Sequence, residues 1–181
     1  MTMRCATFVR GALLGCAVLS GSVAAVRDLQ QPASVDLAVS KQAGNRVDTR
    51  HLTVSASTGP LAAAPPRRVT LFADVTPKPK MHVYSPEQKD VIPVALTIEP
   101  GDHVTPGVTR FPKPEKYFFA PIKETQLVYS KPFRLAQDVT LAASASGAVT
   151  IKGTLRYQAC DESICYVPQN VPLSWTVTLK P

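Results

Sequence analysis

The chain has 181 residues, with 20 Lys and Arg against 13 Asp and Glu, which gives a formal net charge of +7. The basic residues are scattered and have no interleaved aromatic residues, so we expect a solvated surface and no nucleic-acid binding. The sequence has no recognisable phosphate-cradling glycine loop, Ser-His-Asp order or paired-carboxylate motif, which weighs against a kinase or a hydrolase.

The first 25 residues predict a secretory signal peptide. A short basic region precedes an apolar run that ends in small residues, with cleavage expected after Ala24 or Ala25. Cleavage removes Cys5, Cys16 and two arginines, which lowers the net charge to about +5. A competing interpretation is a lipoprotein site with Cys16 as the lipid-bearing terminus, but the apolar run continues past it. We therefore expect a periplasmic or secreted protein in an oxidising compartment.

Residues 26–48 are polar and mixed, which predicts a flexible leader. The remaining residues, 49–181, have the size of one sandwich domain. The chain has 17 prolines, and their recurrence from Pro60 to Pro132 leaves no window for a long helix. The predicted fold class is therefore all-β. The predicted strands are 51–56, 67–75, 81–85, 92–98, 126–129, 139–145, 149–159 and 171–179.

Three successive aromatic residues, Tyr117, Phe118 and Phe119, lie in a loop bounded by prolines. They cannot all face inward from a strand, so we expect at least one to be exposed or folded over another feature. An ordinary core role at the end of the sandwich is the alternative.

The three histidines, His51, His82 and His103, have no ligand-like spacing to one another. We expect them at the surface or at a sheet edge, and we expect no metal site. His82 and Tyr84 lie two residues apart, so an extended backbone puts them on one face.

The range 149–159 alternates apolar and polar residues, which predicts a half-buried strand. The same parity puts Cys160 on the polar face, with its sulfur toward solvent or a groove. The range 171–179 repeats the pattern. The two ranges therefore predict a hairpin with Cys160 and Cys165 at its throat.

The cysteine pair, separated by four residues, allows three interpretations. A structural disulfide is common in small exported proteins, although closing so short a loop contributes only about 2 kcal/mol in the chain-entropy model. A metal site lacks a third Cys or a nearby His. The third interpretation is a redox-active pair. The negative charges of Asp161 and Glu162 disfavour a thiolate at the neighbouring Cys160, so we expect a disulfide that is opened by the thiolate of a partner protein.

The segments Tyr157-Gln-Ala-Cys160 and Cys165-Tyr-Val-Pro168, with the acidic loop between them and the Val-Pro-Leu-Ser that follows, carry a resemblance to a known family. They closely resemble the active-site region of the amino-terminal periplasmic domain of DsbD, a transmembrane thiol:disulfide interchange protein. Met81-His-Val-Tyr84-Ser-Pro resembles the segment that puts an aromatic residue beside the cysteines in this family. The resemblance covers about residues 49–180. The best-known member has one more residue between its cysteines.

The resemblance implies an immunoglobulin-like β-sandwich and a thiol-disulfide oxidoreductase without a cofactor. Its partners are a membrane electron-transfer or thioredoxin-like protein and disulfide-bearing periplasmic clients, and the family is associated with cytochrome c biogenesis. Full-length relatives continue into a membrane domain and a thioredoxin-like domain, whereas this sequence ends at Pro181, so the expected electron donor is a separate protein. A non-catalytic binding module with a structural disulfide is the alternative.

The resemblance also implies roles for single residues. Cys160 and Cys165 are the catalytic pair, with Cys165 the expected target of partner attack. The implied aromatic shield has as candidates Tyr84, Tyr117, Phe118 and Phe119. The residues expected to modulate the loop are Tyr157, Asp161 and Glu162.

Overall fold

The computed structural model describes residues 43–62, 64, 66–120 and 123–179, and its regular elements are all β-strands. The all-β prediction is confirmed. The predicted signal peptide and residues 26–42 of the predicted leader lie outside the described residues. Among the residues that are described, none forms a helix able to cross a membrane.

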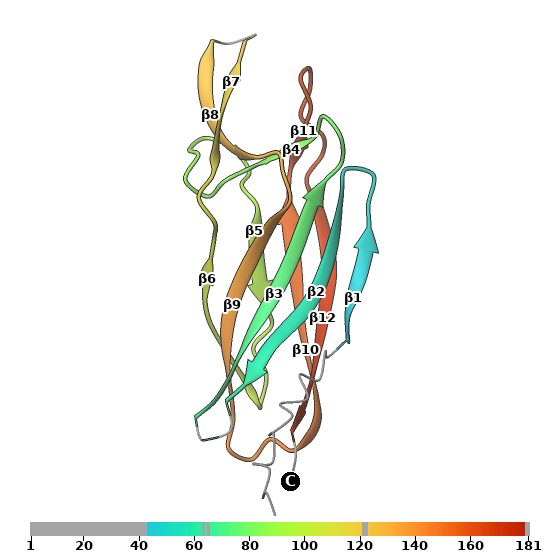
Figure 1. Cartoon of the computed structure of the whole chain (residues 1–181), viewed down its shortest axis with the longest axis vertical. Coiled ribbons are helices and arrows are strands. Elements are labelled where there is room, and N and C mark those ends of the chain that lie inside the picture. Colours follow the sequence, from blue (N-terminus) through green and yellow to red (C-terminus); the bar gives the residue numbers. More distant parts are fainter. Residues whose placement is uncertain (1–42, 63, 65, 121–122, 180–181) are drawn as a thin grey trace, which may run out of the picture. The chain divides into compact units, whose positions relative to one another are not determined.

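The strands form three antiparallel sheets (Figure 1). The five-stranded sheet has the order β1-β2-β3-β9-β6 and consists of β1 (Ala43–Asp48), β2 (Leu52–Leu61), β3 (Arg67–Pro77), β9 (Phe133–Leu141) and β6 (Val104–Arg110). The three-stranded sheet has the order β12-β10-β5 and consists of β12 (Gln169–Leu179), β10 (Gly147–Tyr157) and β5 (Ala95–Ile98). The four-stranded sheet has the order β11-β4-β8-β7 and consists of β11 (Ala159–Cys160), β4 (His82–Tyr84), β8 (Glu124–Tyr129) and β7 (Glu115–Phe119).

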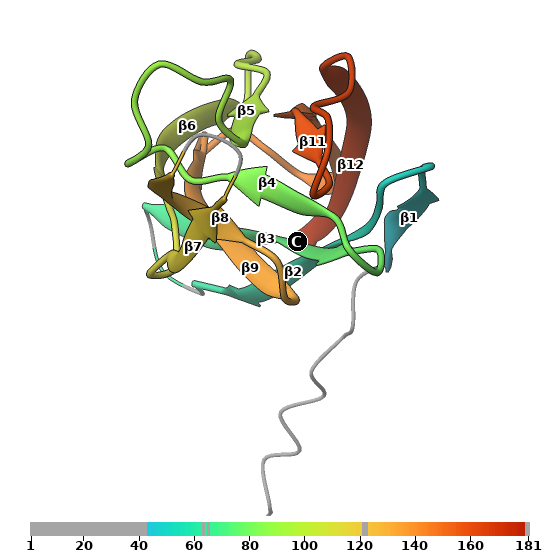
Figure 2. The same cartoon turned by 90° about the horizontal axis from the view of Figure 1, so that it is seen from above.

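The five-stranded and three-stranded sheets pack face to face around one hydrophobic core, as Figure 2 shows from above. Alternate residues of the long strands point inward, because successive side chains of a strand project to opposite faces. In β12 the buried residues are Val171, Leu173, Trp175, Val177 and Leu179. The Trp175 Nε1–H donates to the carbonyl oxygen of Phe72 in the opposite sheet at 2.9 Å. The domain is an immunoglobulin-like β-sandwich.

Gly153 of β10 lies where the core leaves no room for a side chain. A Cβ at this position would come within 2.6 Å of the carbonyl oxygen of Thr97 and 3.1 Å of the Trp175 ring. The glycine therefore leaves room for the backbone of β5 and for the ring of Trp175, the largest core side chain.

One edge of the sandwich is joined by the side chain of Asn45 in β1. Its Oδ1 accepts from the amide of Ser174 at 2.8 Å, and its Nδ2 donates to the carbonyl oxygen of Pro172 at 3.3 Å. Asn45 thus connects the outermost strand of the five-stranded sheet to β12, the outermost strand of the other.

Several strand boundaries differ from the predictions. Residues 43–48, assigned to the leader, form β1 and pair with β2. Residues 104–110 and 115–119, for which no strand was predicted, form β6 and β7. β9 spans 133–141 instead of 139–145. Prolines at strand edges account for part of the difference, since Pro106 lies in β6, the outermost strand beside β9.

Candidate functional site

The two cysteines lie in the loop that connects β10 to β12, at the closed end of this hairpin. The two strands pair from Gly147↔Leu179 to Tyr157↔Gln169, which confirms the predicted hairpin. Beyond this register Cys160 and Cys165 form a disulfide with an S–S distance of 2.02 Å. The sandwich therefore holds the disulfide in a short loop at one end of the domain (Figure 1).

The two halves of the disulfide have very different exposures. The side chain of Cys165 is exposed, whereas Cys160 is 1% exposed and packs with Tyr84 and Val128. The prediction that Cys160 continues the polar face of its strand was wrong. The ladder of β10 ends at Tyr157, and Ala159 and Cys160 pair instead with β4, so the alternation does not carry through.

Asp161 organises the turn between the cysteines. Its Oδ1 accepts from the amides of Ser163 at 2.7 Å and Ile164 at 2.9 Å, and its Oδ2 accepts from the hydroxyl of Tyr166 at 2.8 Å. The two amides and the hydroxyl together hold the pKa of the Asp161 carboxyl below its usual value. The loop therefore carries a negative charge next to Cys160.

Tyr166 anchors this turn to the β1–β2 connection. Its ring lies 4.4 Å from the ring of His51, and the Arg50 guanidinium lies 5.7 Å from the ring centroid. Because its hydroxyl also donates a hydrogen bond to Asp161, Tyr166 links the cysteine loop to the edge of the sandwich.

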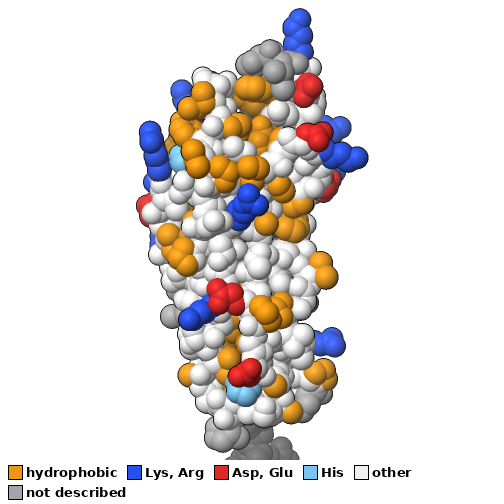
Figure 3. All heavy atoms as spheres, turned by 180° about the vertical axis from the view of Figure 1, so that it is seen from behind, with side chains coloured by type: hydrophobic (Ala, Val, Ile, Leu, Met, Phe, Trp, Pro, Cys, Tyr) orange, Lys and Arg blue, Asp and Glu red, His pale blue; other side chains and the backbone are white. Residues whose placement is uncertain are grey.

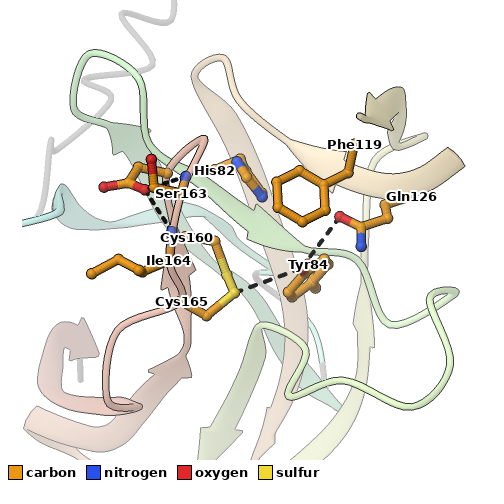
Figure 4. A pocket seen from close by; sticks show the side chains of 9 residues that line it. His82, Tyr84, Phe119, Gln126, Cys160, Ser163, Ile164 and Cys165 are labelled. Atoms are coloured by element: carbon orange, nitrogen blue, oxygen red, sulfur yellow. Dashed lines mark hydrogen bonds between the residues drawn. A yellow bond between two sulfur atoms is a disulfide. The ribbon is translucent and has the colours of Figure 1, made fainter. Parts of the chain in front are cut away.

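A small pocket of about 110 Å³ opens beside the disulfide (Figure 4). The residues that line it are His82, Tyr84, Phe119, Gln126, Cys160, Asp161, Ser163, Ile164 and Cys165. The Tyr84 hydroxyl donates to Gln126 Oε1 at 3.3 Å and lies 3.7 Å from Cys165 Sγ. Burial raises the pKa of Tyr84, although the bond to Gln126 opposes this. A neutral hydroxyl thus faces the exposed sulfur.

The three successive aromatic residues occupy strand β7 and not a loop. Phe119 lines the pocket, and the ring of Tyr117 lies 6.4 Å from that of Phe119 on the same face of the strand. Phe118 projects to the opposite face and is 60% exposed, which confirms that one of the three lies at the surface. Figure 3 shows hydrophobic side chains gathered at the end of the domain that carries β7, β8 and the cysteine loop.

Two of the three histidines are not at the surface, contrary to the prediction. His51 is 6% exposed and His82 is 4% exposed, whereas His103 is exposed as expected. Burial lowers the pKa of both buried imidazoles, and for His82 the charge of Asp161 partly opposes this shift. Neither ring nitrogen of His51 has a hydrogen-bond partner among the described residues.

The remaining predicted loop residues have separate locations. Tyr157 is fully buried in the sandwich core, where its hydroxyl shares a 2.8 Å hydrogen bond with Thr49, and it does not line the pocket. Glu162 lies at the exposed tip of the loop. Gln126 and His82 were not predicted as pocket residues. The alternation of side chains along β4 and β8 is the sequence signal that could have placed them on the same face as Tyr84. Within the described residues, no group of three His, Cys, Asp or Glu could hold a metal ion.

Comparisons with known proteins give a family match over most of the domain. The model of the family described as "Thiol:disulfide interchange protein DsbD, N-terminal" matches residues 50–174. Among curated proteins, none matches the sequence.

Solved structures provide matches at low sequence identity. The N-terminal periplasmic domain of ScsB from Proteus mirabilis is 13% identical, with a TM-score of 0.57, over 74% of this chain and 51% of that chain. This chain therefore spans about half the length of the ScsB chain, and at this identity the likeness concerns the fold alone. The reduced DsbD n-terminal domain from Neisseria meningitidis is 19% identical, with a TM-score of 0.38, over 71% of this chain and 86% of that chain. The yeast GGA1 GAE domain is 11% identical, with a TM-score of 0.40, over 71% of this chain and 94% of that chain.

Proposed function

The chain belongs to the family of DsbD N-terminal domains, and from this we propose that it relays electrons in the periplasm through a reversible Cys160–Cys165 disulfide. A membrane or thioredoxin-like protein supplies the electrons, and disulfide-bearing periplasmic proteins receive them. The periplasmic location also rests on the predicted signal peptide, and the ScsB relative is described as a periplasmic domain.

The observation that carries the proposal is the asymmetry of the disulfide. Cys165 is exposed and Cys160 is 1% exposed, so a partner's thiolate reaches only the Cys165 sulfur. Its electron pair forms a bond to Cys165 Sγ, and the pair of the old S–S bond leaves with Cys160. Attack by Cys160 on the mixed disulfide reverses this step, whereas attack by a second thiol of the partner on the partner's own sulfur releases Cys165 and leaves both cysteines reduced. The reduced pair passes its two electrons on by the same exchange with a client disulfide, which leaves Cys160–Cys165 oxidised.

Exposed hydrophobic residues beside the site support docking of a partner. Ile164 is 56% exposed in the cysteine loop, and Val167 is 77% exposed just after it. Phe118 of β7 adds a third apolar side chain at the same end of the domain (Figure 1). Apolar groups of this kind, gathered around a reactive atom, exclude water when a partner covers them.

In this proposal Phe119 is the shielding residue. It lines the pocket with both cysteines, whereas Phe118 faces away and Tyr117 lies against His82 with ring centroids 4.9 Å apart. The Phe119 ring therefore covers part of the approach to the disulfide from the side of β7 and β8.

The reduction potential tests the proposal against a structural disulfide. The protein is equilibrated with a thioredoxin or glutathione redox series, and mass spectrometry counts the free thiols of the peptide that contains Cys160 and Cys165. A reversible potential of roughly −270 to −120 mV fits a relay. A potential well below about −300 mV, or a bond that is reduced only when the domain unfolds, contradicts the proposal and leaves a structural disulfide.

Trapping of partners provides the second test. Cys160→Ser leaves Cys165 free to hold a mixed disulfide that cannot be resolved, whereas Cys165→Ser leaves only the buried sulfur. We expect disulfide-linked partners with Cys160→Ser and far fewer with Cys165→Ser, seen on non-reducing gels. Equal trapping by both variants contradicts the assigned order of attack.

A further inference from the structure

His82 lies directly opposite Cys160 in the sheet. The two residues are register partners in the antiparallel pair of β4 and β11. Residues that are directly opposite in such a pair project to the same face, with Cβ atoms about 4.5–5.5 Å apart. Both line the pocket, and Figure 4 shows the His82 ring in the pocket beside the disulfide. The imidazole is therefore the titratable side chain that the sheet places beside the buried sulfur.

A negative charge is less stable on the buried Cys160 sulfur than on the sulfur of the exposed Cys165. When a partner attacks Cys165, Cys160 leaves as a thiolate in a site that is 1% exposed. Burial disfavours this charge, and the neighbouring Asp161 carboxylate repels it. Water stabilises an ion at Cys165, which is exposed, but it has little access to Cys160. A nearby group that supplies and removes a proton relieves this cost.

We propose that His82 is the catalytic residue that transfers a proton to and from the Cys160 sulfur. The proposal rests on the thiol-disulfide exchange proposed above. In the forward step the partner sulfur bonds to Cys165, the S–S electron pair leaves with Cys160, and the imidazolium of His82 gives its proton to that sulfur. In the reverse step neutral His82 takes the proton from the Cys160 thiol, and the thiolate attacks the mixed disulfide. Solvent restores the proton through the pocket.

The surroundings of His82 fit both protonation states. The ionisable groups that face it are Asp161 from the cysteine loop, Tyr117 from β7 at 4.9 Å between rings, Tyr84 from β4 at 5.8 Å, and Cys160 itself. Burial favours the neutral ring, and the Asp161 charge favours the protonated ring. Burial is the larger of the two effects, so the pKa of His82 is lowered, and the Asp161 charge beside the ring keeps the protonated form accessible for proton transfer.

The test compares His82→Gln with the matched control His103→Gln, which changes an exposed histidine. The rate of disulfide reduction by dithiothreitol is measured from pH 5 to pH 9 in the full chain, with mass spectrometry of the Cys160–Cys165 peptide. We expect His82→Gln to slow reduction about tenfold, below the usual range for acid–base catalysis because a thiolate is a good leaving group. We also expect it to remove the inflection that the wild type and His103→Gln share. Equal pH profiles for all three proteins overturn the proposal.

A second measurement does not depend on whether the His82→Gln variant folds. The imidazole of His82 is titrated by NMR in the unmutated protein, once oxidised and once reduced. We expect its pKa to differ between the two forms, because only the reduced form has a Cys160 thiol that titrates with it. Identical titrations overturn the role of His82. Failure of the exchange function itself is a separate result, since the disulfide then resists dithiothreitol at every pH in the wild type as well.

Discussion

Tyr84→Phe tests how the pocket controls the exposed sulfur. The Tyr84 hydroxyl lies 3.7 Å from Cys165 Sγ and donates to Gln126 Oε1 at 3.3 Å. In the reduced protein we expect the same hydroxyl to donate to the Cys165 thiolate. A hydrogen bond to the charged form lowers the pKa of a thiol, so its removal raises that pKa.

The size of the effect follows from the length of the contact. A hydrogen bond to a charged acceptor contributes about 1.5–3 kcal/mol. Because the oxygen–sulfur distance is long and Gln126 competes for the hydroxyl, we take the lower end. About 1.4 kcal/mol corresponds to a rise of about one unit in the Cys165 pKa. At neutral pH this leaves about tenfold less thiolate, because the ordinary pKa of a cysteine thiol is near 8.5.

The assay uses a Cys160→Ser background, in which Cys165 is the free thiol of the site. The rate of alkylation by iodoacetamide is followed against pH by mass spectrometry, with and without Tyr84→Phe. Tyr129→Phe is the matched control, because its buried hydroxyl donates to the carbonyl oxygen of Pro112 at 2.8 Å. A Cys165 pKa that is unchanged or lower in Tyr84→Phe refutes the reasoning.

Three further predictions concern the shield, the turn and the acid stability. Phe119→Ala should speed reduction of the disulfide by dithiothreitol several-fold, whereas Phe118→Ala should not; equal effects contradict the shielding role. Tyr166→Phe removes one of the three hydrogen bonds to the Asp161 carboxylate, so NMR titration should show a higher pKa for the Asp161 carboxyl. An unchanged pKa counts against the role of Tyr166 in holding the turn. Bonds from Arg110 and a threonine lower the pKa of Asp138 to about 2. Its contribution to stability is therefore complete above the unfolded pKa and lost as pH falls toward 2. Asp138→Asn should lower Tm at pH 7 but not at pH 2, and a pH-independent loss contradicts this.

The sandwich and the cysteine hairpin were predictable because they depend on local alternation. The inward residues of 149–159 and 171–179 share a period of two, and the observed register keeps that parity as far as Tyr157. The strands that escaped prediction, β1, β6 and β7, are all outermost strands of their sheets. β1 is an outer strand joined to β12 by Asn45, and β6 contains a proline that is tolerated only at an edge.

The site was predictable in its cysteines but not in their surroundings. The burial of Cys160 depends on the pairing of β11 with β4, a strand far upstream, which no periodicity around the cysteine indicates. The same pairing, together with Tyr117 of β7, buries His82. His51 is buried by Tyr166, more than a hundred residues away. Local patterns set the parity of a strand, whereas tertiary pairing decides which face is covered.

The amide of Asn45 has a consequence for the behaviour of the protein in solution. An outermost strand offers free N–H and C=O groups, which are a template for pairing with another molecule. By bonding both Ser174 and Pro172, Asn45 occupies two such groups of β12 without adding a strand to it. This side chain thus makes pairing of another molecule with β12 through these two backbone groups less favourable.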